Sequence, residues 1–131
     1  MSKKKFKEPK KAYNGFVYII KIHIDPIVIF KIGTTNRTAE TRMLEIAGEL
    51  NRVLGYIPKM VLVRKKQTKD NYKVEADVLK QTEKYRYILA CNGEISGESE
   101  LRKMEEIQLI NLYESCLIKD YPADQEFKVE L

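Results

Sequence analysis

The sequence predicts a small α+β domain in which a three-stranded antiparallel sheet is flanked by helices. Two short runs rich in β-branched and aromatic residues lie close together near the N-terminus, and a third such run follows at residues 60–63. Between and after these runs, apolar residues recur every three or four positions, which is typical of amphipathic helices. With 131 residues, the chain fits one domain with a single modest core.

The first two strands are predicted as a hairpin over residues 16–24 and 27–32. Asp25-Pro26 between these runs is a turn-type pair. Lys31 is a single charge inside the second apolar run. Burial of its ammonium is unfavourable unless the group is paired, its pKa falls, or it reaches the edge of the sheet. His23 lies five residues after Tyr18 and therefore on the opposite face of the first strand, so we do not include His23 among the candidate site residues.

A helix is predicted to follow Gly33. Apolar residues recur with helical spacing over residues 39–54, and Asn36 and Thr38 are both suitable N-cap residues. Arg42 then lies near the N-terminal end of this helix. A guanidinium close to free backbone N–H groups suits the binding of a phosphate.

Residues 60–63 predict a third, central strand with apolar residues on both faces. A basic loop follows and leads into a helix, predicted over residues 71–89, with Glu75 at the margin of its apolar stripe. The loop is either simply solvated or, beside a phosphate-handling site, holds a nucleic-acid backbone and offers a tyrosine for stacking on a base. The residues predicted to contact nucleic acid here are Arg64, Lys65, Lys66, Lys69, Tyr72 and Lys73.

A last helix is predicted to begin after Ser99, with apolar side chains turned inward. The inward set comprises Leu101, Met104, Ile107, Ile110 and Leu117. The outer face carries Glu98, Glu100, Glu105 and Glu106. Its negative charge predicts that this face points away from nucleic acid.

Charge is unevenly distributed along the chain, which has a formal net charge of +5. We interpret residues 1–12 as a basic disordered tail, 13–118 as the domain and 119–131 as a C-terminal tail. The basic tail is either a solvated extension or an arm that contacts phosphates. No apolar run is long enough to cross a membrane and no secretory signal is visible, so we expect a cytoplasmic protein. Two cysteines without ligand spacing and one histidine argue against a zinc site.

Three motifs together resemble the GIY-YIG nuclease superfamily, in the branch common in phages and large viruses. Val17-Tyr18 is followed by Lys31-Ile32-Gly33, and Arg37 and Arg42 come four and nine residues after that glycine. The second motif of this branch reads Lys-Ile-Gly. Phe-Val-Tyr stands in place of Gly-Ile-Tyr, with the glycine one position upstream. The resemblance covers roughly residues 15 to 105.

The resemblance also implies site residues and a cofactor. Glu75 is in the place of the family's metal-binding glutamate, although Leu79 stands where related domains often carry a histidine. It would bind Mg²⁺ or Mn²⁺, Arg42 would clamp the scissile phosphate, and Arg37 would support that contact. Tyr18 would act as or orient the general base, with Lys31 assisting. The implied function is a metal-dependent endonuclease that hydrolyses phosphodiester bonds in DNA, or in RNA.

Two other functions remain open from the sequence. The first is a nucleic-acid-binding module that keeps the fold without useful catalysis, in line with the departures at the first motif and at Leu79. The second is a phage or viral protein that binds a host protein through the acidic last helix.

Overall fold

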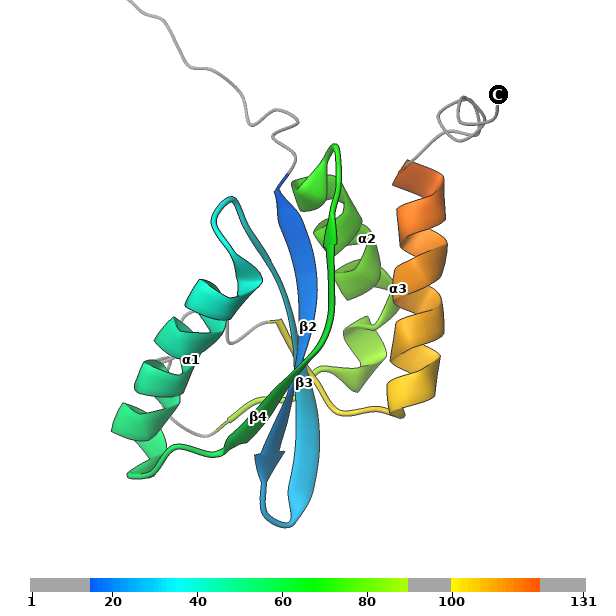
Figure 1. Cartoon of the computed structure of the whole chain (residues 1–131). Helices are drawn as coiled ribbons and strands as arrows, with labels where there is room; N and C mark the ends of the chain where they lie inside the picture. Colours follow the sequence, from blue (N-terminus) through cyan, green and yellow to red (C-terminus); the bar gives the residue numbers. More distant parts are fainter. Residues whose placement is uncertain (1–14, 90–99, 121–131) are drawn as a thin grey trace, which may run out of the picture.

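The computed structural model describes residues 15–89 and 100–120, and the two predicted tails lie largely outside this part of the chain. It forms an antiparallel sheet of four strands in the order β4-β2-β3-β5, with three α-helices (Figure 1). The elements in chain order are β2 Phe16–Ile24, β3 Ile27–Thr35, α1 Ala39–Leu54, β4 Lys59–Gln67, α2 Asn71–Gln81, a 3-10 turn Glu83–Tyr85, β5 Leu101–Arg102 and α3 Glu106–Asp120. No helix of the described residues is long and apolar enough to cross a membrane.

The predicted hairpin is confirmed as the centre of the sheet. β2 and β3 pair in continuous register from Phe16 opposite Thr35 to Ile24 opposite Ile27, around the cis-Pro turn. The predicted helix after the hairpin is also confirmed, because Thr38 caps α1 by accepting a hydrogen bond from the N–H of Thr41.

Helices cover both faces of the sheet, α1 on one side and α2 with α3 on the other (Figure 1). Alternation along the central strands creates two cores. The first joins Tyr18, Ile20, Ile22 and Ile29 to α1, and the second joins Val17, Ile19, Phe30 and Ile32 to α2 and α3. A hydrogen bond of 2.8 Å from the Tyr113 hydroxyl to the Val17 carbonyl fixes α3 against the second face.

The prediction of a central third strand is wrong in position and length. β4 is an edge strand that pairs only with β2 among the described strands, and it continues through Gln67. Residues 64–67 therefore belong to this strand rather than to a loop, and they are exposed. Apolar residues occur on both faces of residues 60–63 because helices flank this edge on both sides, and this pattern resembles that of a central strand.

The C-terminal third also differs from the prediction. α2 ends at Gln81 instead of continuing to residue 89, and a fourth strand, β5, pairs with β3. α3 begins at Glu106, after β5, and its Ile107 is exposed rather than inward. Because the chain is extended at residues 101–102, Glu100 does not lie on the outer face of the last helix.

Candidate functional site

Tyr18 lies opposite Gly33 in the central hairpin and is almost completely buried. A Cβ atom on Gly33 would lie only 2.3 Å from the Tyr18 hydroxyl oxygen and 2.5 Å from Cζ. The phenol therefore occupies the space that a side chain at position 33 would need. This contact explains physically why a glycine ends the second motif.

Arg42 extends from the first turns of α1 toward the Tyr18 hydroxyl. Its guanidinium lies 3.0 Å from Glu45 Oε1 and 3.9 Å from Glu49 Oε2. Burial raises the pKa of Tyr18 to about 12, the charge and hydrogen bond of Arg42 lower it, and the charges of Glu100 and Glu75 raise it. The phenol is therefore protonated near neutral pH, and Arg42 favours its ionised form.

Lys31 is buried on β3. The sequence left open whether its ammonium is paired, has a lowered pKa or reaches the edge of the sheet, and the structure shows that it is paired. Its ammonium lies 2.5 Å from Glu100 Oε1, and 6.0 Å from the centroid of the Tyr18 ring. The Lys31 side chain is 2% exposed and that of Glu100 is 25% exposed. Lys31 is thus held as an ion pair at the side of the site.

Glu75 comes from α2 and is partly buried beside Glu100. Burial, followed by the hydrogen bond and the charge of Glu100, raises the pKa of Glu75 to about 8, while Lys31 and Thr34 act in the opposite direction. Two carboxyl groups in such contact share a proton or a cation more readily than they carry two negative charges. The structure therefore brings Tyr18, Lys31 and Glu75 together.

Glu100 is the residue of this cluster that sequence reasoning missed. The sequence placed it on a solvent-facing helix, whereas it precedes β5 and contacts Lys31. Lys31 itself was the available signal, because a lysine inside an apolar strand calls for a carboxylate partner elsewhere in the chain. Nothing in the sequence identified which of the 19 acidic residues it would be.

Arg37 lies at the exposed margin of the site and shares Glu45 with Arg42. Its two terminal nitrogens lie 2.8 and 2.9 Å from the two Glu45 oxygens. The pKa of Glu45 is lowered to about 2. The hydrogen bonds from Arg37 are the largest cause, and the hydrogen bond from Arg42 acts in the same direction. One carboxylate thus joins both arginines.

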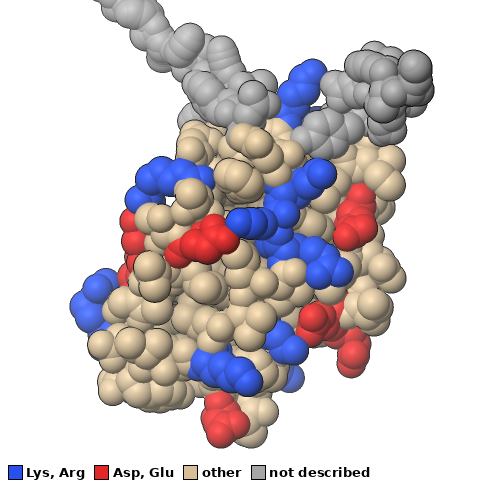
Figure 2. All heavy atoms as spheres, viewed as in Figure 1, with Lys and Arg blue, Asp and Glu red and all other residues tan. Residues whose placement is uncertain are grey.

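The residues predicted to contact nucleic acid are exposed along β4 and the start of α2. Figure 2 shows Lys and Arg side chains gathered along β4, with acidic side chains on both flanks. Most of these residues are already engaged. Arg64 pairs with Glu114 at 3.6 Å, Lys65 with Glu40 at 2.6 Å and Lys73 with Asp77 at 3.6 Å, and the Tyr72 hydroxyl accepts a hydrogen bond from Asn36. Lys66 and Lys69 are also exposed.

The donor set of the site limits the metal that it can hold. Within residues 15–89 and 100–120, no group of three or more His, Cys, Asp or Glu side chains is placed for a metal. Glu75 and Glu100 nevertheless present adjoining carboxylate oxygens, which are hard donors. These residues fit Mg²⁺ or Mn²⁺ held by one or two carboxylates and completed by water and phosphate.

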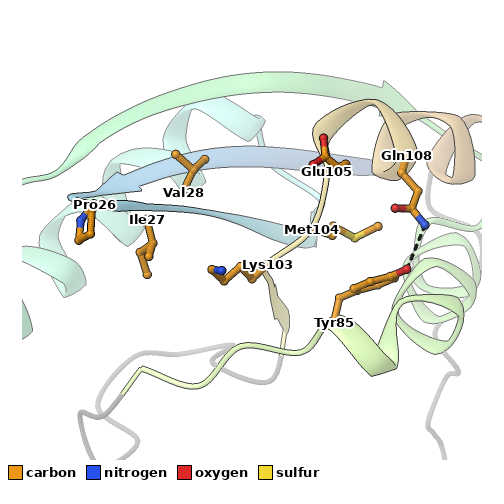
Figure 3. A pocket seen from close by; sticks show the side chains of 8 residues that line it. All are labelled: Pro26, Ile27, Val28, Tyr85, Lys103, Met104, Glu105 and Gln108. Atoms are coloured by element: carbon orange, nitrogen blue, oxygen red, sulfur yellow. Dashed lines mark hydrogen bonds between the residues drawn. The ribbon is translucent and has the colours of Figure 1, made fainter.

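A separate hollow of about 410 Å³ lies beside the β2–β3 turn (Figure 3). Tyr85 and Gln108 close one side of it through a hydrogen bond of 3.1 Å. None of the predicted site residues lines this hollow. The candidate site is therefore the polar cluster between the sheet, α1 and α2.

The fold defines a small α+β domain with a cluster of polar and charged side chains beside its central hairpin. The chain belongs to the T5orf172 domain family, whose model matches residues 15–117. This family is associated with nuclease-like modules. Searches among curated proteins and among solved structures give no match to the chain.

Proposed function

We propose that this protein is a metal-dependent endonuclease of the GIY-YIG type that hydrolyses phosphodiester bonds in DNA. The observation that carries the proposal is the convergence of Tyr18, Lys31, Arg42 and Glu75 from four different elements. Phosphodiester hydrolysis needs positive charge on the non-bridging oxygens, a group that handles the proton of water, and charge stabilisation at the leaving oxygen.

In this proposal Arg42 binds the scissile phosphate, and Arg37 makes a supporting contact once the phosphate displaces Glu45. Tyr18, with its pKa near 12, orients the attacking water and ionises only with help from Arg42. Lys31 offsets the negative charge of the two glutamates, so that a phosphodiester can approach them.

Glu75 is the proposed ligand of Mg²⁺ or Mn²⁺, with Glu100 beside it. The cation, when bound, supplies positive charge at the leaving oxygen. Because carboxylates bind metal only without their proton, and the pKa of Glu75 is about 8, metal affinity should increase as the pH rises toward 8.

The basic residues of β4 and the start of α2 would hold the nucleic-acid backbone. Lys66 and Lys69 are exposed, and the exposed ion pairs of Arg64, Lys65 and Lys73 can exchange their carboxylate partners for phosphates. Binding should accordingly weaken with salt.

The test is incubation of supercoiled and single-stranded DNA, and of RNA, with the full chain in Mg²⁺, Mn²⁺ or chelator. Metal-dependent nicking that disappears in Glu75→Gln and in Arg42→Ala supports the proposal. Glu106→Gln is the matched control, because this glutamate on α3 pairs with Lys21, outside the proposed site and its basic residues, and should leave cleavage unchanged. Intact substrate in every sample, or cleavage that persists in Glu75→Gln, rejects it.

A second candidate is a nucleic-acid-binding module without catalysis. It is favoured by the high pKa of Tyr18 and by the engagement of Arg42 with two glutamates. This function predicts salt-dependent binding of DNA that Glu75→Gln leaves unchanged and that chelator does not affect.

A further inference from the structure

The ion pair between Lys31 and Glu100 is unusual because its cation has almost no contact with solvent. An ammonium in this position is strongly unfavourable unless a carboxylate lies next to it. The distance of 2.5 Å between Lys31 Nζ and Glu100 Oε1 shows that the pair is direct. By contrast, the similar pair between Lys21 and Glu106 lies at 2.8 Å with both side chains partly exposed.

Glu100 is held in place by the strand that follows it. Leu101 pairs with Lys31 and Arg102 with Phe30, so the register of β5 brings Glu100 to Lys31. The Tyr87 N–H donates to the Leu101 carbonyl, at 3.0 Å, which ties β5 to the neighbouring segment as well. A carboxylate at the end of an anchored strand is well suited to position another side chain.

The same Glu100 carboxyl group also contacts Glu75 through a hydrogen bond. It therefore links two residues that the proposed mechanism uses and that come from different elements, β3 and α2. An ion pair that served only to fasten β5 would need no second contact with a residue of the site.

We propose that Glu100 is a positioning residue of the candidate active site, which holds the Lys31 ammonium beside Tyr18 and links it to Glu75. The inference rests on the proposed nuclease function and deepens it. Glu100 itself does not touch the phosphodiester. It acts through Lys31 and Glu75, as the outer carboxylates of metal sites act through the ligands that they orient.

The test combines kinetics with a signal that does not depend on cleavage. Glu100→Gln keeps the shape of the side chain but removes its charge, and Glu106→Gln makes the same change in the partly exposed pair with Lys21. The ammonium of Lys31 is observed by ¹H–¹⁵N NMR in the full chain, and kcat and KM for DNA nicking are measured where circular dichroism shows each variant folded.

In Glu100→Gln we expect the Lys31 ammonium signal to shift or to disappear through faster exchange with water. We expect kcat to fall by about 10- to 100-fold, with KM changed less than about twofold. Glu106→Gln should change neither quantity. If Glu100→Gln does not fold, Glu100→Asp, which keeps the charge but shortens the side chain, is compared in the same way and should give a smaller change in the same direction.

Two results would overturn the inference. An unchanged Lys31 signal means that Glu100 does not hold the ammonium. A changed signal with a wild-type kcat means that the pair is only structural. A wild-type protein that cleaves no substrate rejects the proposed function instead, and the Lys31 signal then still decides separately whether Glu100 holds this lysine.

Discussion

Two cations are buried on neighbouring strands of this sheet, Lys31 on β3 and Arg102 on β5, and they have different partners. Each residue is 1% exposed. Arg102 donates to Thr82 Oγ1 at 2.9 Å, to the Leu79 carbonyl at 3.1 Å and to the Leu101 carbonyl at 2.9 Å. Arg102 also lies 3.6 Å from the carboxylate of the exposed Glu83, whereas Lys31 meets a carboxylate that also contacts Glu75.

The difference shows that burial of a charge does not by itself mark a functional site. Arg102 donates to the Leu79 carbonyl and the Thr82 hydroxyl at the C-terminal end of α2, where a cation also complements the helix dipole, and so it fixes β5 to α2. Lys31 donates to the Glu100 carboxylate and faces two titratable carboxyls, those of Glu100 and Glu75. The first cation is therefore expected to matter for stability and the second for chemistry.

The largest expected effect is on stability, in Arg102→Met. This change keeps most of the aliphatic volume but removes three hydrogen bonds, to the buried Thr82 hydroxyl and to the Leu79 and Leu101 carbonyls, so we expect a loss of about 3 kcal/mol in the free energy of unfolding. Urea denaturation followed by circular dichroism measures it. Arg86→Met removes an exposed pair with Glu83 and should change stability by less than about 1 kcal/mol. Equal losses in both variants would contradict the structural role of Arg102.

The reverse pattern is expected for Lys31→Met. The loss of stability should be only about 1 kcal/mol, because Glu100 is 25% exposed and can share a proton with Glu75 once the ammonium is gone. DNA nicking should nevertheless fall by about 100-fold, since the charge that offsets the two glutamates is lost. The same denaturation series and the nicking assay measure both quantities. A loss of stability as large as that of Arg102→Met, with activity retained, would remove the contrast between the two cations.

Part of this site was predictable because its signals are local. The hairpin follows from two β-rich runs and an Asp-Pro turn, and α1 from its spacing and its Thr38 cap. Once these elements are placed, Tyr18 and Arg42 meet on one face of the sheet without any further information.

The remaining part depends on contacts between distant segments. β5 has two residues, too few for any periodicity, and its pairing with β3 joins positions about 70 residues apart in the chain. The sequence therefore predicts Glu100 as one of several glutamates on the outer face of the last helix. β4 was misplaced for a related reason, because the order of strands in a sheet is set by packing that a single run of residues does not reveal.

The shared proton of Glu75 predicts that stability depends on pH. Its pKa is raised from 4.5 to about 8 in the folded chain, so the folded state holds this proton more tightly than the unfolded state. The stabilisation is present below pH 4.5 and should be lost as the pH rises through 8. Thermal melts across this range should show a falling Tm, and Glu75→Gln should flatten the decrease. A Tm that rises over this interval, or an unchanged slope in Glu75→Gln, would contradict the contact between Glu75 and Glu100.

The smallest expected effect concerns the exposed pairs around Glu45, which extend the contrast between buried and exposed charges. Glu45 binds Arg37 through both oxygens and Arg42 through one, where a phosphate is proposed to bind. Glu45→Gln should therefore raise the affinity for duplex DNA by about threefold, the scale of one exposed ion pair. Glu106→Gln, paired with Lys21 outside the proposed interface, changes the net charge equally and should raise it less. Fluorescence anisotropy at fixed salt measures the DNA affinity of both variants. Equal increases would show that only net charge matters, and that Glu45 does not compete with a DNA phosphate for the two arginines.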